Sequence, residues 1–541
     1  MTHGNFRVPT PVNEPVRSYA PGSPERASIE SELKRQSDME LDVPLLIGGE
    51  EVRTGDTSPM IVPHNHKHVT GHFHMAGEKE VAAAMDACQD AARGWEAMPW
   101  NERVAIFLKA ANLLEGPYRD RVNASTMLGQ SKTVHQAEID AACELIDFFR
   151  FNCSYAEQLY MEQPESAPGM WNRLEHRPLE GHVLALTPFN FSSIAANLPA
   201  APALMGNTTI WKPSETSVLS NWYLVELLQE AGVPAGVINF LPGPAPEIAG
   251  QVIKDSRFAG VHFTGSTRVF NGIWKIIGNN MDNYKTYPRV VGETGGKDFI
   301  MAHPSTDPRV LAIAMLRGAF EFQGQKCSAA SRAYVPRSLW NAVKEVLAEE
   351  LPQVKMGDVA DLSNFMGAVI NQTAFDRNQG AIDRARESKD AEIVFGGTCD
   401  DSVGYFIEPT IIEAKTPRYE TMETELFGPV LTVFVYEDDK FEETLALVDS
   451  TSPYALTGAI FSQDRAAVAQ ATEALRFSAG NFYVNDKPTG AVVGQQPFGG
   501  GRASGTNDKA GSILNLLRWV SPRTIKETFV PPTDWRYPFL G

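Results

Sequence analysis

Short apolar segments alternate with helical segments through the middle of the chain, from Val183 to Ile300. Parallel strands require crossover connections, and these are usually helices. The alternation therefore predicts the α/β class, with a doubly wound Rossmann-type sheet of the kind that binds nucleotides at its carboxyl edge. The expected strands are 183–187, 208–211, 237–240, 260–263 and 289–291, and the expected helices include 218–231, 248–254 and 269–277.

The segments around this alternation suggest further domains. At about 100–200 residues per domain, a chain of 541 residues should contain two to four of them. Residues 47–52 form the pattern of a hairpin with a Gly turn. Helical periodicity follows over 78–98, 102–114 and 136–159. A second α/β region should extend from 298 to about 486.

The first 45 residues are rich in proline and are expected to form an extended arm without a long helix. They lack the apolar core of a signal peptide and the Arg-rich amphipathic pattern of a transit peptide. The expected location is the cytoplasm, or the mitochondrial matrix if the chain is a processed form. The apolar stretch 194–211 contains Asn197, Pro199 and Pro202, so it is not expected to cross a membrane.

Charge and cysteine content exclude several functions. The chain has 48 basic and 66 acidic residues, with a net charge of −18, which opposes binding to nucleic acid or to an anionic membrane. Its 5 cysteines show no C-x-x-C spacing, so neither a disulfide framework nor a zinc site is expected. The histidines at 64, 66, 68, 72 and 74 could share strand faces, but Lys67 interrupts them and no nearby carboxylate or thiol completes a site. We interpret them as part of a solvated hairpin and expect no metal.

Two segments could hold a dinucleotide. Gly265-Ser266-Thr267 ends one expected strand and opens a helix, where backbone N–H groups and a hydroxyl could bind a pyrophosphate. The alternative is that Ser266 or Thr267 merely caps that helix. Lys212 and Glu215 follow another strand, and a carboxylate there can accept hydrogen bonds from ribose hydroxyls while repelling a 2′-phosphate. These features favour NAD over NADP.

Three further residues would suit covalent chemistry at a carbonyl carbon. A Cys327 thiolate could attack an aldehyde, the Asn190 amide could stabilise the oxyanion, and the Glu293 carboxylate could activate water against a thioester. Each has an ordinary alternative: a buried cysteine, turn chemistry beside Pro188 and a solvated strand end. A thiol with a pKa near ~8.5 also needs a local shift or a base.

Six motifs in order resemble the NAD-dependent aldehyde dehydrogenase superfamily: 188–190, 212–215, 263–267, 293–297, 324–327 and 425–429. Segments 136–140, 144–152, 293–298, 489–500 and 503–509 look similar to one branch, the L-glutamate γ-semialdehyde dehydrogenases. Thr294 and Phe189, which depart from the Leu and Trp of most other members, indicate the same branch. The resemblance covers the chain from about residue 45 onward.

The resemblance implies a role for each matching residue. Cys327 would be the nucleophile, Glu293 the base and Asn190, with the Cys327 N–H, the oxyanion donor. Cofactor binding would involve Thr187, Pro188, Lys212, Glu215, Gly265, Ser266, Thr267, Glu425 and Phe427. The substrate pocket would include Ser328, Gly490, Ala491, Phe498, Phe191 and Glu144. Some relatives have serine at the position of Ala491, so backbone N–H groups would replace that contact. A helix glutamate such as Glu144 is otherwise an exposed or paired carboxylate.

The resemblance also implies an architecture and partners. We expect a discontinuous NAD domain (46–160 and 182–293), a catalytic domain (294–488) and a small β oligomerisation region (161–181 and 508–541). The tail pattern suits strand addition, so we expect a homodimer or higher homo-oligomer. The leading hypothesis is oxidation of glutamate semialdehyde, with a separate proline dehydrogenase as a candidate partner. The alternatives are another small aldehyde, or a non-oxidative thiol hydrolase or binding protein on this fold.

Overall fold

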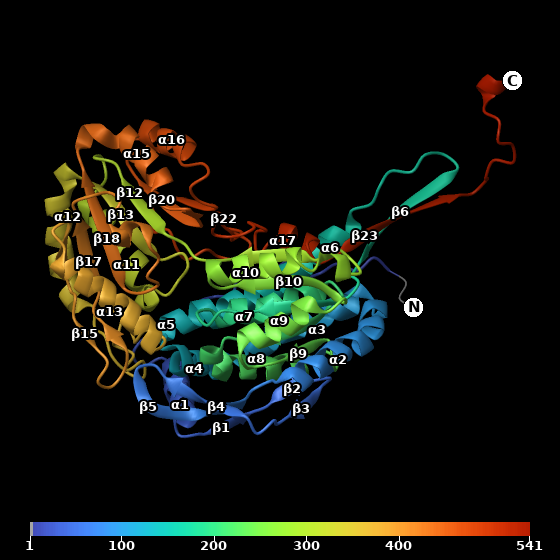
Figure 1. Ribbon diagram of the computed structural model, residues 1–541, viewed down its shortest axis with the longest axis horizontal. Coiled ribbons are helices and arrows are strands. Elements are labelled where there is room, and N and C mark those ends of the chain that lie inside the picture. The colour runs from blue at the N-terminus through green and yellow to red at the C-terminus, as the bar shows by residue number, and fades with distance from the viewer. Residues whose placement is uncertain (1–3) are drawn as a thin grey trace.

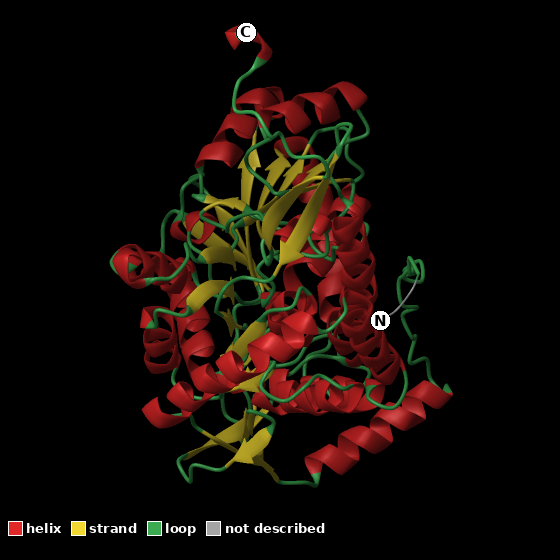
Figure 2. Ribbon diagram, turned by 90° about the vertical axis from the view of Figure 1, so that its right-hand side faces the viewer, coloured by secondary structure: helices red, strands yellow, loops and turns green. Residues whose placement is uncertain are grey.

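The computed structural model describes residues 4–541, which form two adjoining lobes and a projecting two-stranded ribbon (Figure 1). Helices cover the faces of the sheets in both lobes (Figure 2). Each lobe contains one seven-stranded sheet that is mostly parallel. This confirms the α/β class predicted from the alternation of strands and helices.

The first sheet has the order β11-β10-β7-β8-β9-β2-β3. Its first five strands pair in parallel, and the hairpin β2–β3 adds an antiparallel edge. The bounds of the strands are β2 (Leu45–Ile47), β3 (Glu50–Val52), β7 (His182–Leu186), β8 (Thr208–Lys212), β9 (Ile238–Phe240), β10 (Phe258–Thr264) and β11 (Arg289–Glu293). All five strands expected between 183 and 291 are therefore present.

Helices surround this sheet. They are α2 (Glu78–Ala97), α3 (Trp100–Glu115), α4 (Arg119–Gln130), α5 (Val134–Ala137), α6 (Glu144–Met161), α7 (Ser192–Leu204), α8 (Val218–Ala231), α9 (Ala245–Lys254) and α10 (Thr267–Gly278). The helix expected over 136–159 is interrupted by a π-helical segment, Glu138–Cys143, before α6 begins. Such segments often occur at functional sites, and here the segment carries Glu138 and Asp140 into the interior.

The second sheet has the order β14-β17-β18-β13-β12-β20-β21, with β14 alone antiparallel to its neighbour. Its strands are β12 (Asp298–Ala302), β13 (Ala330–Pro336), β14 (Ala391–Phe395), β17 (Thr410–Ala414), β18 (Val430–Tyr436), β20 (Thr457–Phe461) and β21 (Asn481–Val484). Its helices are α11 (Pro308–Phe320), α12 (Arg337–Glu350), α13 (Gln372–Glu387), α14 (Glu420–Glu423), α15 (Phe441–Ser450) and α16 (Arg465–Ala474). The second α/β region is confirmed.

The ribbon consists of β6 (Met170–Arg177) paired antiparallel with β23 (Ser521–Thr528) over eight residues. It extends away from both lobes, and the C-terminus lies beyond its end (Figure 1). The short helix α17 (Ile513–Leu517) precedes it. There are also two small strand pairs, β15 (Cys399–Asp400) with β16 (Phe406–Ile407) and β19 (Tyr454–Ala455) with β22 (Gly501–Arg502).

The prediction that residues 1–45 are extended throughout was wrong. Residues 24–37 form helix α1 (Pro24–Ser37), because Ser23 caps it and Pro24 occupies the first turn, where the missing N–H costs no hydrogen bond. Ile29 and Leu33 on this helix are buried. The strand β1 (Leu41–Val43) then pairs in parallel with β5 (Asn65–His74).

The histidine segment does form a hairpin, of β4 (Thr57–Val62) with β5, but it is not uniformly solvated. His64 and His74 are buried, and each has a polar partner. His64 lies 3.1 Å from the Ser131 hydroxyl, and His74 lies 3.1 Å from an Asp42 carboxylate oxygen. Among residues 4–541, no group of three or more histidines, cysteines or carboxylates is placed to hold a metal ion. No helix in that range is both long and apolar enough to cross a bilayer.

Candidate active site

The predicted dinucleotide residues meet at one edge of the first sheet. Strands β10, β7 and β8 are parallel neighbours, so their carboxyl ends lie side by side. Ligands of open α/β sheets bind at such an edge. The structure places there Thr187 and Pro188 after β7, Lys212 and Glu215 at and after β8, and Gly265, Ser266 and Thr267 at the end of β10.

Lys212 fits a ligand at this edge. Its side chain is mostly buried and lies at the carboxyl end of β8. Burial lowers its pKa to about 8, and Glu215 offsets only part of that shift. A ribose hydroxyl or phosphate oxygen could accept a hydrogen bond from its ammonium group.

Ser266 caps helix α10, since its Oγ accepts a hydrogen bond from the backbone N–H of Val269 at 3.3 Å. The capping interpretation is therefore confirmed. Thr267 donates a hydrogen bond to the Thr294 hydroxyl at 3.0 Å, beside the segment that follows Glu293. The pyrophosphate role of this turn stays a prediction.

The turn that carries Cys327 contains unusual backbone. Phe322 and Gln323 have φ values of 52° and 53°, which only residues held firmly by their surroundings adopt. The Gln323 amide donates to the carbonyls of Ser131 at 2.9 Å and Ala368 at 2.7 Å. These bonds hold the strained turn, and the chain after it places Cys327 between the two lobes, just before β13.

Asn190 lies on the other side of the nucleophile turn, in the loop between β7 and α7. Its Nδ2 donates a hydrogen bond to the carbonyl of Gln325 at 3.0 Å, two residues before Cys327. The amide has a second N–H. The structure therefore brings the predicted oxyanion donor next to the predicted nucleophile.

Glu293 is the last residue of β11 and is held by the loop that follows β21. Its Oε2 accepts a hydrogen bond from the backbone N–H of Gly500 at 2.9 Å. Burial raises the pKa of Glu293 well above its ordinary value, and the Gly500 N–H and Lys509 counteract this only partly. A carboxyl group with a raised pKa is a stronger base once it is ionised, as activation of water requires.

Burial also raises the pKa of the Cys327 thiol, and the nearby carboxylates of Asp298, Glu425 and Glu293 raise it further. These surroundings therefore favour the neutral thiol over the thiolate. Attack on a carbonyl requires that the proton leaves to a base. Glu293 is close enough to affect the thiol electrostatically and is the natural acceptor.

A cavity of about 250 Å³ opens beside Cys327. Its wall includes every residue predicted to bind substrate: Phe191, Glu144, Ser328, Gly490, Ala491 and Phe498. These residues come from both lobes and from the loop after β21. A single cavity with the nucleophile at one side can hold a small aldehyde.

The cavity wall is polar in part. The Ser328 hydroxyl shares a hydrogen bond with Thr489 at 2.8 Å, and Gly490 has φ of 92°, which favours glycine. Glu144 accepts a hydrogen bond from the Ser193 hydroxyl at 2.7 Å. Burial and the neighbouring Asp140 raise its pKa to about 8. Glu144 thus faces the cavity instead of forming an exposed or paired carboxylate.

Glu425 and Phe427 lie in the loop before β18. The Glu425 carboxylate accepts a hydrogen bond from the Gly296 N–H at 2.9 Å. A Cβ on Gly295 would lie 2.2 Å from this carboxylate, so a larger residue there would displace the Glu425 side chain. The Phe427 ring meets Phe189 edge to face at 5.8 Å. Both residues lie near the catalytic groups, and their contacts with nicotinamide stay a prediction.

Sequence reasoning missed several residues of the cavity wall. Among them, Asn13 and Glu14 belong to the N-terminal arm, and Asp147 lies on α6. The arm was predicted only to be extended, because its prolines exclude a long helix. The only available signal was the polar pair Asn13-Glu14 between Pro11 and Pro15, and such pairs are common in turns.

The site combines a cysteine, an amide donor and a carboxyl group beside the carboxyl edge of a mostly parallel sheet. Such a set suits covalent chemistry at a carbonyl carbon next to a bound dinucleotide. Residues 52–525 match the model of the aldehyde dehydrogenase family. The chain belongs to this family.

Individual relatives are similar over the full chain. The chain is 54% identical to the mitochondrial delta-1-pyrroline-5-carboxylate dehydrogenase of Dictyostelium discoideum, over 100% of this chain and 98% of that protein. It is 49% identical to the mitochondrial human protein of that name, over 98% and 94% of the two chains. The crystal structure of the Mycobacterium tuberculosis delta-pyrroline-5-carboxylate dehydrogenase bound with NAD superposes with a TM-score of 0.96, at 52% identity and 99% coverage of both chains.

Proposed function

We propose that this protein oxidises L-glutamate γ-semialdehyde, which forms from delta-1-pyrroline-5-carboxylate, to L-glutamate with NAD. The observation that carries the proposal is the single cavity that contains Cys327 and all six predicted substrate residues. Relatives at about half identity carry the corresponding name, and one of them has been crystallised with NAD.

The first step forms a covalent bond between the Cys327 sulfur and the aldehyde carbon. The thiol proton passes to ionised Glu293 as the C–S bond forms. The second N–H of Asn190 and the backbone N–H of Cys327 donate hydrogen bonds to the alkoxide oxygen. When bound, NAD supplies the acceptor for the hydride that leaves the alkoxide carbon.

The second step releases the product from the thioester. Glu293 first releases the thiol proton to solvent. The ionised carboxylate then removes a proton from a water molecule, and the resulting hydroxide attacks the thioester carbon. The C–S bond then breaks, so L-glutamate leaves and the Cys327 sulfur is restored. The Gly500 N–H fixes the carboxylate that performs this proton transfer.

The comparisons also suggest a setting. Several relatives are named as mitochondrial proteins, and we propose the mitochondrial matrix or the cytoplasm as the location. The chain also matches 54% of a proline utilization A structure from Bdellovibrio bacteriovorus, at 28% identity and a TM-score of 0.90. We propose that a separate proline dehydrogenase supplies the substrate.

We further propose that the ribbon β6–β23 joins subunits. It projects from the body (Figure 1), and Trp171 on it is about half exposed. An exposed strand edge and a large apolar side chain favour pairing with a second copy. Sedimentation velocity of the full chain should show a dimer or a higher homo-oligomer, and a monomer at micromolar concentration would contradict this.

A substrate panel tests the activity. NADH formation from pyrroline-5-carboxylate should exceed that from acetaldehyde and succinic semialdehyde in kcat/KM, and NAD should be preferred to NADP. Equal rates across the panel would favour a dehydrogenase of another small aldehyde. Absence of any aldehyde-dependent NADH would favour a thiol hydrolase or binding protein.

A further inference from the structure

We propose that Asn13–Val16 of the N-terminal arm form the outer wall of the substrate pocket and determine which aldehydes it accepts. The inference rests on the proposed function, because it concerns the substrate of that pocket. Residues 489–496 are called the substrate loop. Asn13 would influence specificity by holding this loop in position.

The arm lies at the pocket although it is far from Cys327 in sequence. Asn13, Glu14 and Val16 line the same cavity as Cys327, although more than 300 positions separate them along the chain. Without these residues, the cavity would be open between helix α6 and the substrate loop. The arm is therefore a structural part of the pocket.

Asn13 joins the two elements on either side of it. Its Nδ2 donates hydrogen bonds to Asp147 of α6 at 2.8 Å and to the carbonyl of Val493 at 2.8 Å. Its Oδ1 accepts a hydrogen bond from the Gln495 amide at 2.9 Å. One side chain thus fixes the substrate loop, which contains Gly490 and Ala491, against α6.

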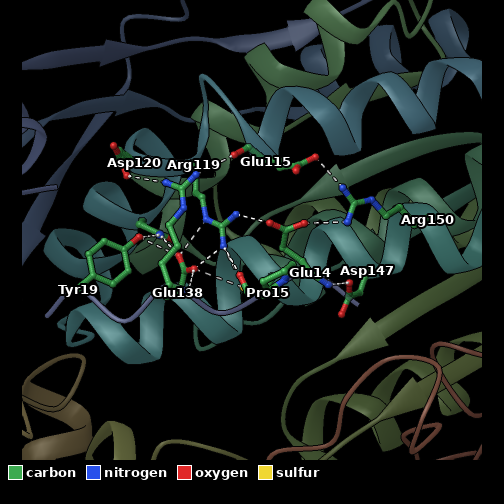
Figure 3. A network of polar contacts seen from close by, with 12 residues as sticks. Glu14, Pro15, Tyr19, Glu115, Arg119, Asp120, Glu138, Asp147 and Arg150 are labelled. Atoms are coloured by element: carbon green, nitrogen blue, oxygen red, sulfur yellow. Dashed lines mark hydrogen bonds and ion pairs between the residues drawn. The ribbon is translucent and has the colours of Figure 1, made fainter. Parts of the chain in front are cut away.

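A buried network of charges holds the arm in this position (Figure 3). Arg119 pairs with both Glu14 and Glu138, and Arg150 donates to the second oxygen of Glu14 at 2.8 Å. The Glu14 N–H also donates to Asp147 at 2.7 Å.

The next part of the arm is bound in the same way, because Glu138 accepts from the Arg17 N–H at 2.8 Å and from the Tyr19 hydroxyl at 2.9 Å. Separation of the arm would remove Glu14 from Arg119 and Arg150 and would deprive buried Glu138 of its Arg17 and Tyr19 donors, which is unfavourable. The arm therefore stays closed over the pocket.

This arrangement affects long and short aldehydes differently. The amino-acid end of glutamate semialdehyde must reach the substrate loop, whereas propanal needs only the groups around Cys327. A loop that Asn13 no longer fixes would bind the amino-acid end less well. The loss should appear in the ratio of kcat/KM for glutamate semialdehyde to kcat/KM for propanal.

The test compares Asn13→Ala with Val12→Ala in the full-length enzyme. Val12 is 70% exposed on the same arm and serves as the matched control. We expect Asn13→Ala to lower the ratio about tenfold, mainly through KM for the semialdehyde, because the substrate loop loses its hydrogen bonds. Val12→Ala should change the ratio less than twofold. A ratio that Asn13→Ala leaves within twofold of wild type, or an equal fall with both aldehydes, would overturn the proposal.

A second variant tests whether Asn13 acts through the substrate loop. Gln495→Ala removes one partner of Asn13 from an exposed position. If Asn13 acts through the substrate loop, the two substitutions together should lower the ratio by less than the product of their separate effects. Fully multiplicative effects would show that Asn13 acts independently of the loop and would overturn the positioning role.

The wall can also be tested without turnover. The rate at which N-phenylmaleimide alkylates Cys327, followed by mass spectrometry, should rise severalfold in Asn13→Ala, because the pocket opens. If the wild-type enzyme makes no NADH from pyrroline-5-carboxylate, the proposed function fails. The alkylation rate still decides on the wall in that case, and equal rates in wild type and Asn13→Ala would overturn it.

Discussion

The molecule contains two buried polar regions that shift the pKa of a glutamate in opposite directions. The first region, the arm network, consists of Glu14, Arg119, Glu138 and Arg150. Burial alone would raise the pKa of Glu138, but the Arg119 hydrogen bond and charge lower it overall. In the active site, burial raises the pKa of Glu293 well above its ordinary value, because no cation forms an ion pair with it within residues 4–541. Paired charges fix a structure, whereas an unpaired carboxyl group retains a proton-transfer function.

The comparison extends to one cysteine in each of these regions, and both line the substrate cavity. Cys143 is buried, and its sulfur lies within 3.6 Å of Glu138 and Arg119 in the arm network. Cys327 is partly exposed, and the Asn190 amide is bonded to the turn that carries it. The neighbouring groups therefore distinguish the two cysteines, since burial raises the pKa of both thiols.

The largest effect should come from removing the nucleophile. Cys327→Ala should lower aldehyde-dependent NADH formation by about 10³-fold or more, because no covalent intermediate can form. A spectrophotometric assay at 340 nm measures this. The control is Cys153→Ala, which changes a buried thiol of the first lobe and should keep most of the activity. Retention of more than a few per cent of activity in Cys327→Ala would contradict the mechanism.

Removing the base should have the next largest effect and a distinctive time course. Glu293→Gln should lower steady-state turnover by about 10²–10⁴-fold, the usual contribution of general base catalysis. Because Glu293 also accepts the thiol proton in the first step, stopped-flow measurement should show that the first equivalent of NADH forms more slowly than in wild type. A burst of NADH at the wild-type rate would show that Glu293 acts only after the thioester has formed.

Mutation of the arm network should lower the free energy of unfolding. Arg119→Met leaves Glu14 and Glu138 buried without that partner and should cost about 3–5 kcal/mol of unfolding free energy. Arg309→Met is the matched control, because Arg309 pairs with Glu349 and Glu350 at the surface and should contribute below about 1 kcal/mol. Urea unfolding followed by tryptophan fluorescence compares the two. Similar losses in both variants would show that the buried network has no special role.

The sequence was sufficient for elements with clear periodicity and insufficient where burial removes it. Helix α8 was predicted at its observed bounds, Val218–Ala231. Helix α4 was missed because almost every residue in it is buried, so it has no polar face. Helix α7 was missed because it contains Pro199 and Pro202. The two lobes bring Asn190, Glu293 and Cys327 together, which only the family resemblance could indicate.

The arm shows why the rest of the site could not be predicted. Asn13 and Glu14 acquire their roles from contacts with Asp147, Val493 and Arg119, which are distant in sequence. No local pattern encodes such partners, because the arm has no regular periodicity before α1. Long-range hydrogen bonds of irregular segments therefore remain the part of a site that the fold alone reveals.

The smallest expected effect is a pair of opposite pH dependences. Because the folded-state pKa of Glu138 is lowered, its stabilising contribution is present above pH 4.5 and is lost as pH falls through the lowered pKa. Because the folded-state pKa of Glu293 is raised, the fold favours its neutral form, and that contribution is present below pH 4.5 and declines as pH rises toward the raised pKa. Each pH unit within these windows changes stability by at most about 1.4 kcal/mol per group.

Unfolding free energies of two variants between about pH 2 and pH 9 test these signs. Relative to wild type, Glu293→Gln should gain stability as pH rises, because the variant has no carboxyl group to ionise in the buried site. Glu138→Gln should lose less stability than wild type as pH falls below 4.5, since the charge on which the ion pair depends is already absent. Parallel curves for the two variants would mean that pairing with Arg119 does not distinguish the two regions.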